Sequence, residues 1–129
     1  MNTKNEWENE WEKEPSFLEF SYKGYLCQIR RHSSLLNLCG YVVLPKQNKF
    51  FGKNYNDIDV EVHGGLTYSQ DIGEDFWKIG FDCGHLYDIS PGLSPSFLED
   101  KSTYKNIEYV KREIENMVDQ IIEKEETND

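Results

Sequence analysis

The side chains best suited to chemistry lie in two short stretches of this 129-residue sequence. Residues 62–68 read Val-His-Gly-Gly-Leu-Thr-Tyr and contain His63 beside a glycine pair. Residues 82–88 add Asp82, Cys83, His85 and Asp88. Both stretches follow apolar, strand-like segments, so the chain has a candidate site where two strands end.

Metal binding is one chemistry that these residues suggest, because cysteine, histidine and aspartate are all zinc ligands. The candidate ligands are His63, Cys83, His85 and Asp88. Cys83 and His85 are two residues apart and would point the same way in an extended strand. No second pair has metal-ligand spacing, and the pattern is not a standard zinc signature. We therefore expect no cofactor, with zinc as the alternative.

Thiol catalysis is a second possibility, in which Cys83 is the nucleophile, His63 is the base and Asp59 or Asp82 orients it. Cysteine is also a small hydrophobe that often ends a buried strand. In that interpretation His63 and His85 only hydrogen-bond to the backbone in turns at the strand ends, and the glycine pair forms a bulge. The sequence leaves the enzyme question open and favours a protein with no catalytic residue.

The elements that would position these groups follow from apolar periodicity. Alternation and turn residues predict strands over 17–22, 25–31, 38–44, 58–62, 66–68 and 76–81, with loops over 46–57, 69–75 and 84–103. An apolar stripe predicts a helix over about 106–124, with Asn106 as its N-cap. The expected fold is α+β: an antiparallel sheet of about four to six strands, with the C-terminal amphipathic helix packed on one face.

Strand register then predicts which side chains meet. His63 should point away from the core with Asp59 and Glu61, and a turn at Gly84 should bring His85 back beside Asp82. Aromatic residues should form the walls. The expected ligand- or partner-binding surface comprises His63, Gly64, Gly65, Tyr68, Asp82, His85, Asp88, Phe50 and Phe51.

Composition limits the class of protein. The formal net charge is −10, and residues 1–14 and 123–129 each contribute −3 of it. Such a balance disfavours non-specific nucleic-acid binding, which needs Lys and Arg. Three cysteines without a CxxC pair, no signal peptide and no membrane-length apolar run predict a cytoplasmic protein. We expect an acidic N-terminal arm over 1–15, one domain over 16–124 and an acidic tail over 125–129.

Several strings of the chain resemble a family of small uncharacterised proteins encoded by bacteriophages and prophages. The signature strings are Val62-His63-Gly64-Gly65-Leu66-Thr67-Tyr68 and Gly80-Phe81-Asp82-Cys83-Gly84-His85, with Leu38-Cys39-Gly40-Tyr41-Val42 before them and Tyr109-Val110-Lys111-Arg112-Glu113 after them. The resemblance covers about residues 24–122. Phe76 stands where relatives usually have a second Trp. The resemblance implies a phage or prophage origin and no particular chemistry.

Together these observations predict a small acidic binding protein of phage type that acts in the host cytoplasm. It would inhibit or sequester a host defence protein or a small nucleotide signal. The alternatives are a metal- or thiol-dependent enzyme built on the His63, Cys83, His85 and Asp88 cluster, and an accessory structural phage protein. The sequence does not indicate the oligomeric state, or whether Trp7 and Trp11 dock the arm on the domain.

Overall fold

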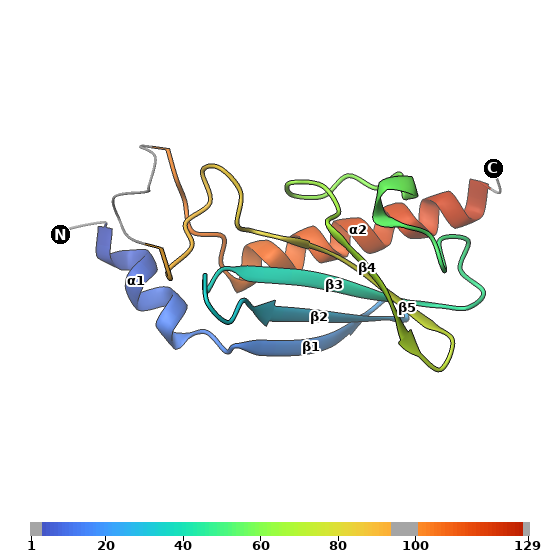
Figure 1. Ribbon diagram of the computed structural model, residues 1–129, viewed down its shortest axis with the longest axis horizontal. Coiled ribbons are helices and arrows are strands. Elements are labelled where there is room, and N and C mark those ends of the chain that lie inside the picture. The colour runs from blue at the N-terminus through green and yellow to red at the C-terminus, as the bar shows by residue number, and fades with distance from the viewer. Residues whose placement is uncertain (1–3, 94–100, 128–129) are drawn as a thin grey trace.

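A computed structural model of the chain describes residues 4–93 and 101–127. Within these residues five strands form one antiparallel sheet in the order β1-β2-β3-β5-β4. The strands are β1 (Phe17–Tyr22), β2 (Tyr25–Arg31), β3 (Leu38–Pro45), β4 (Tyr68–Gly73) and β5 (Phe76–Asp82). Helix α2 (Ile107–Thr127) lies along one face of the sheet (Figure 1). The predicted α+β architecture is confirmed.

The hydrophobic core fills the layer between the sheet and α2. The buried helix residues are Val110, Ile114, Met117, Val118 and Ile121, which are the predicted stripe. Gly40 of β3 allows the closest approach, because a Cβ there would lie 2.7 Å from the Phe81 ring and 3.0 Å from Ile114. The helix begins after Asn106, whose side-chain oxygen accepts a hydrogen bond from the Tyr109 backbone N–H at 2.8 Å. That is the predicted N-cap.

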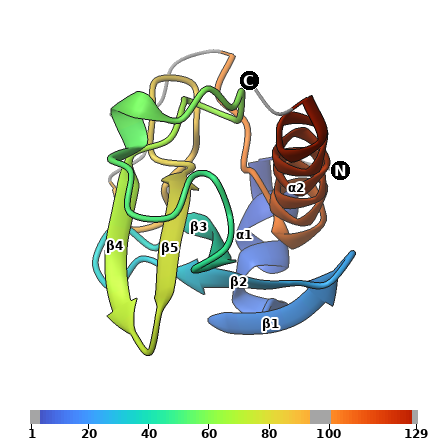
Figure 2. The ribbon, with the colours of Figure 1, turned by 90° about the vertical axis from the view of Figure 1, so that its right-hand side faces the viewer.

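The other face of the sheet is covered by no helix in the described part of the chain, and the strands turn progressively from β1 to β4 (Figure 2). We call this surface the open face. Cross-strand register places on it the side chains of Gln28, Arg30, Cys39, Tyr41, Tyr68, Lys78 and Asp82. β3 is the central strand, and only its helix-side residues lie under a second layer.

The predicted strand over 58–62 does not form. Ile58 and Val60 are buried and Asp59 and Glu61 are exposed, so the alternation of burial is as expected. The backbone of Glu61, however, exchanges hydrogen bonds with the Gln120 side chain of α2 at 2.8 and 2.7 Å. Extended chain bonded to helix side chains therefore replaces a strand, because β3 and β4 already occupy both edges of β5.

β4 is the strand that the sequence did not predict, since residues 69–75 were expected to be a loop. It pairs with β5 from Tyr68↔Gly80 to Gly73↔Phe76. The turn is made by Glu74 and Asp75, both in the left-handed region with φ of 56° and 66°. This is the geometry of a tight hairpin turn, which Asn and Gly usually supply, so the sequence signal was weak.

Helix α1 (Lys4–Lys13) of the N-terminal arm contacts the domain. The guanidinium of Arg31 lies 5.5 Å from the Trp11 ring centroid, and the Trp7 ring lies 6.5 Å from that of Tyr104. Just after the helix, Glu14 accepts hydrogen bonds from Arg31 and from the first backbone N–H of α2. Both tryptophans are half-buried. No described helix is long and apolar enough to cross a membrane.

Candidate functional site

Four polar side chains beside α2 form a closed hydrogen-bonded group, which we call the His63 clasp: His63, Asp88, Lys105 and Tyr109. His63 Nε2 lies 2.8 Å from Asp88 Oδ2, and Nδ1 lies 2.7 Å from the Tyr109 hydroxyl. An ionised carboxylate only accepts, so Nε2 donates to Asp88. Both ring nitrogens are engaged.

Asp88 is the centre of the clasp, with its side chain only 2% exposed. Lys105 Nζ lies 3.0 Å from Oδ1, and the His85 backbone N–H donates to Oδ2 at 3.1 Å. Burial alone raises the pKa of this carboxyl. Hydrogen bonds from His63, Lys105 and the His85 backbone outweigh burial and hold the pKa below its ordinary value of 3.8. The clasp thus keeps a buried, ionised carboxylate fully paired.

Asp82 and His85 lie beside the clasp at the end of β5. The prediction that His63 points away from the core with Asp59 and Glu61 was wrong, because 58–62 forms no strand and the His63 side chain bonds to Tyr109 of α2. The His85 Nε2 atom is 3.4 Å from Asp82 Oδ1, and the His63 and His85 ring centroids are 6.1 Å apart. Asp82 also accepts hydrogen bonds from the Gly84 backbone and the Thr67 hydroxyl. The sequence therefore located a real convergence of His63, Asp82, His85 and Asp88.

The glycine pair shapes this convergence. Gly64 has φ of +69°, and a Cβ there would lie 2.3 Å from the His85 ring. Gly65 has φ of +82°, and a Cβ there would meet nothing within 4 Å. The pair forms a turn, closed by the Gly65 N–H donating to the Val62 carbonyl at 2.8 Å. Gly64 is where the backbone packs on the imidazole.

Cys83 lies near this group but is packed in the hydrophobic core, with 1% exposure. Burial raises the pKa of the thiol, and the nearby Asp88 charge raises it further. A buried, protonated thiol is neither a nucleophile nor a good metal ligand. The geometry therefore disfavours the thiol-catalysis hypothesis.

The aromatic walls expected from the loop lie elsewhere. Phe50 is buried in the core, and Phe51 packs against Trp77 with ring centroids 6.1 Å apart. Trp77 is at the opposite end of β5 from Asp82. The expectation that Phe50 and Phe51 wall the His63 group was wrong, because loop length says nothing about the direction in which a loop folds back. Tyr68 lies on the open face instead.

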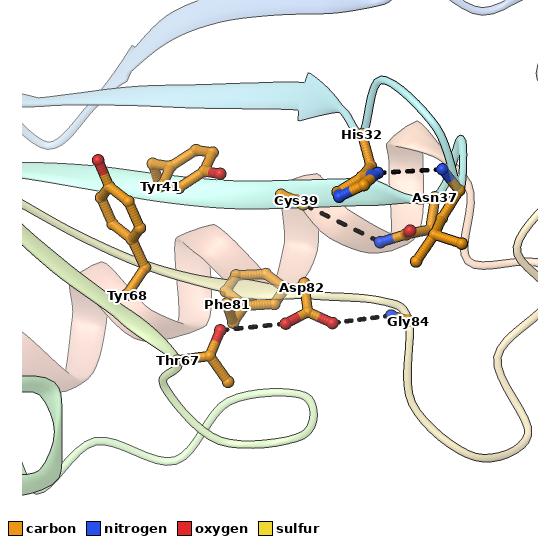
Figure 3. A pocket seen from close by; sticks show the side chains of 10 residues that line it. His32, Asn37, Cys39, Tyr41, Thr67, Tyr68, Phe81, Asp82 and Gly84 are labelled. Carbon is orange, nitrogen blue, oxygen red and sulfur yellow. Dashed lines mark hydrogen bonds between the residues drawn. The ribbon is translucent and has the colours of Figure 1, made fainter.

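A cavity opens on the open face beside Asp82, and we call it the open-face pocket (Figure 3). Its volume is about 290 Å³. The lining residues are His32, Leu35, Asn37, Cys39, Tyr41, Thr67, Tyr68, Phe81, Asp82 and Gly84. Of these, the sequence had singled out only Tyr68 and Asp82 as binding residues. The pocket lies where the end of β3, the end of β5 and the start of β4 meet.

Asn37 is the unusual member of the lining. The residue is 2% exposed, and its Oδ1 has no hydrogen-bond partner. Its Nδ2 makes only long contacts, 3.4 Å to the Leu38 carbonyl and 4.0 Å to Cys39 Sγ. No sequence signal marked it, because a lone Asn before a strand is usually a turn residue.

Two tyrosines wall the pocket along the strands. The Tyr41 and Tyr68 rings meet edge to face, with centroids 5.2 Å apart and planes at 77°. Gly80 makes room for this arrangement, because a Cβ there would lie 2.4 Å from the Tyr41 ring. Burial raises the pKa of the Tyr41 hydroxyl, and the neighbouring Cys39 raises it further. The hydroxyl thus stays a protonated donor.

Among the described residues, no three His, Cys, Asp or Glu side chains are arranged so that they could hold a metal ion. Burial and the Asp82 charge raise the pKa of the Cys39 thiol in the pocket. The arrangement is a cavity beside a fully hydrogen-bonded clasp. Comparison with protein-family models, characterised proteins and solved structures gives no match.

Proposed function

We propose that the protein is a non-enzymatic binding protein that sequesters a small, flat ligand in the open-face pocket. The observation that carries this proposal is the cavity itself, whose lining includes Asn37, a residue 2% exposed with a side-chain oxygen that has no hydrogen-bond partner. A buried acceptor without a partner costs about 1–3 kcal/mol. A donor that reaches this oxygen would remove that cost.

The shape of the pocket favours a small ring over a chain or a large cofactor. Its volume of about 290 Å³ is at the lower end of the range for small-molecule sites, which are concave with few polar groups. The Tyr41–Tyr68 pair supplies a preformed aromatic wall, held by the absence of a side chain at Gly80. Aromatic faces and polar edges together fit a heterocyclic ring such as a nucleobase.

Binding is favoured over catalysis because the groups that would act on a substrate are occupied or protonated. Both nitrogens of His63 are engaged in the clasp, and the pKa of the Cys39 thiol is raised by burial. With the phage-type resemblance, these features support a sequestering protein in the host cytoplasm that removes a small nucleotide signal.

A second candidate is inhibition of a host protein through the open face. Three large apolar side chains are exposed there: Phe17 (43%), Leu26 (41%) and Phe76 (41%). Register spreads them over the face, with Phe17 at the end of Cys39 and Asp82 and Phe76 at the end of Pro45. Exposed apolar side chains on one surface can mark a protein interface. In this candidate the host protein would contact the face around the pocket and not its interior. Substitutions inside and outside the pocket therefore distinguish the two candidates.

Calorimetric titration with adenosine, guanosine, cytidine and uridine tests the first candidate. We expect at least one nucleoside to bind the natural chain. Asn37→Ala and Tyr68→Ala should each weaken that binding by about fivefold or more, since each removes one contact worth about 1 kcal/mol or more. Leu26→Ala is the control, because it changes the open face outside the pocket.

The same titrations separate the candidates. A nucleoside affinity that Asn37→Ala leaves unchanged would contradict the pocket assignment, as would the absence of binding by all four. If Leu26→Ala abolishes capture of a host protein while nucleoside binding is absent, the second candidate is correct.

A further inference from the structure

The open-face pocket contains one carboxylate, that of Asp82. Among its ten lining residues, all in the described part of the chain, the only other side chain of the Asp, Glu, His, Lys or Arg types is His32. The His32 Nδ1 atom accepts from the backbone N–H groups of Ser34 and Leu35, at 3.2 and 3.0 Å. That nitrogen therefore carries no proton, and the ring carries no charge. The charge of the lining is the negative charge of Asp82.

No hydrogen bond from a cation neutralises this carboxylate among the described residues. Oδ2 accepts from the Thr67 hydroxyl at 3.1 Å and Oδ1 from the Gly84 backbone at 2.9 Å, and both donors are neutral. His85 lies outside the lining, with its Nε2 atom 3.4 Å from Oδ1 but without a hydrogen bond. The Asp82 side chain is 34% exposed, and Oδ2 keeps a lone pair for a donor of the ligand.

The negative charge acts on the other groups of the pocket. Cys39 lies opposite Asp82 in the β3–β5 register. Burial raises the pKa of its thiol, and the Asp82 charge raises it further. Burial also raises the pKa of the Tyr41 hydroxyl, so both groups stay protonated around a single carboxylate. In such a site a ligand with a negative charge is repelled and a ligand with a positive charge is attracted.

The tyrosine wall favours the same sign of charge, because the face of an aromatic ring attracts cations. One cation of the protein already uses it: Lys78 Nζ lies 4.5 Å from the Tyr41 ring centroid and 6.0 Å from that of Tyr68. Lys78 is not part of the pocket lining. Along β5 it lies on one side of Gly80, and Asp82 lies on the other. The wall thus has a cation at one end, and the pocket with its carboxylate at the other.

We infer that the ring bound in the open-face pocket is a cationic nitrogen heterocycle, held by the Asp82 carboxylate and by the rings of Tyr41 and Tyr68. The assignment rests on the proposed function, because it gives the charge of the ligand in the same pocket. A neutral ring of the same shape would make the apolar contacts, but it would gain neither the charge-assisted hydrogen bond nor the cation–π contact. The charge, and not the identity of the base, is what the pocket selects.

Two methylated adenosines of the same composition test the charge by calorimetric titration. 1-Methyladenosine carries a positive charge on its base at neutral pH, whereas its isomer N6-methyladenosine is neutral. The cation should bind about tenfold or more tightly than its isomer, since charge-assisted hydrogen bonds are the strong ones and the cation–π contact adds to them. 3-Methylcytidine and N4-methylcytidine repeat the comparison on a pyrimidine, which separates the charge from the identity of the ring.

Asp82→Asn should remove this preference. The asparagine keeps an oxygen for the Gly84 N–H but has no charge, so the ratio of affinities should fall to about threefold or less. Asp71→Asn is the matched control, because Asp71 Oδ1 accepts from the Gly73 backbone at 2.7 Å in the same way and Asp71 is not a lining residue. The control should keep the full ratio. Melting curves show whether both variants are folded.

Lys78→Gln tests the sign of the charge from the other end of the tyrosine wall. For a cationic ligand, removal of this like charge should leave the affinity for 1-methyladenosine unchanged or raise it. For an anionic ligand the same variant should weaken binding, and Asp82→Asn should strengthen it. The two variants together therefore distinguish the two signs of charge.

The outcomes are distinct. Equal affinities for the two isomers, or a ratio that Asp82→Asn leaves unchanged, overturn the cation assignment while leaving the proposed function in place. Binding of neutral nucleosides without binding of either cation does the same. Weaker binding in Lys78→Gln together with stronger binding in Asp82→Asn would show that the ligand is an anion. If no nucleoside binds, methylated or not, the proposed function itself is wrong.

Discussion

The His63 clasp and the open-face pocket are two polar groups at the same end of the sheet, and they differ in how their hydrogen bonds are filled. In the clasp, both nitrogens of His63 and both oxygens of Asp88 have partners. In the pocket, Asn37 Oδ1 is buried with none. A filled network holds segments together, while an unfilled one is suited to a ligand.

The clasp shows what the filled network does. It joins the turn at 62–65, the loop after β5 and the first turns of α2 through one carboxylate. The backbone of His63 adds a further link, donating to Glu113 Oε1 of α2 at 2.8 Å. The residues that looked most like a reactive site in the sequence therefore have a structural role that accounts for their contacts.

The largest expected effect is a difference in stability between two alanine variants, one at an aspartate of the clasp and one at an aspartate of the pocket. Asp88→Ala should cost about 2–4 kcal/mol, because it leaves the half-buried Lys105 and His63 without their shared acceptor. Asp82→Ala should cost about 1 kcal/mol, since its carboxylate is about one third exposed. Urea unfolding of both variants measures the difference. Equal losses would mean that the clasp is not the more important network for stability.

A second pair tests how closely the glycine turn packs against His85. Gly64→Ala combines a positive φ with a Cβ 2.3 Å from the imidazole, and should cost about 2–4 kcal/mol. Gly65→Ala has the positive φ but no neighbour within 4 Å, so only about 1 kcal/mol of strain is expected. Thermal unfolding distinguishes them. Similar losses at both positions would contradict the packing of the Gly64 backbone on His85.

Acid should weaken the clasp through Asp88. The pKa of this carboxyl is lower in the folded chain than its ordinary value of 3.8, so the unfolded state takes up the proton first. The stabilisation is therefore present above the ordinary carboxyl range and is lost as pH falls through the lowered pKa. The free energy of unfolding, measured from about pH 5 to pH 2, should fall less steeply in Asp88→Asn. Parallel slopes would reject this role.

Much of the fold could be predicted from the sequence because burial patterns are local. The apolar stripe and Asn106 gave the helix to within a few residues of Ile107–Thr127. His63, Asp82 and His85 do lie near one another, although the strand register used to predict this does not exist at 58–62. The strand expected over 58–62 shows the limit. Alternation reports which side chains are buried, but the backbone partner there is a helix side chain, Gln120.

The pocket could not be predicted for a related reason. Residues 38–44 are apolar enough to suggest cover on both faces, and nothing local shows that Tyr41 faces a surface without a second layer. Its position depends on Gly80, a residue of β5 that lies directly opposite. The meeting of Asn37 with Asp82 likewise depends on loops that return from different strands. Such sites arise from tertiary contacts, which a single sequence does not specify.

The smallest expected effect on stability is that of replacing Asn37 in the pocket. Asn37→Ala should change the free energy of unfolding by less than about 1 kcal/mol, or raise it slightly. The substitution loses two long contacts of Nδ2, at 3.4 and 4.0 Å, but it also removes the buried oxygen that has no partner. A ligand site kept at the expense of stability predicts this near-neutral result together with impaired binding. Urea unfolding measures the first and the nucleoside titration the second. A loss of several kcal/mol would show that Asn37 supports the fold as the clasp residues do, and the distinction between the two polar groups would then disappear.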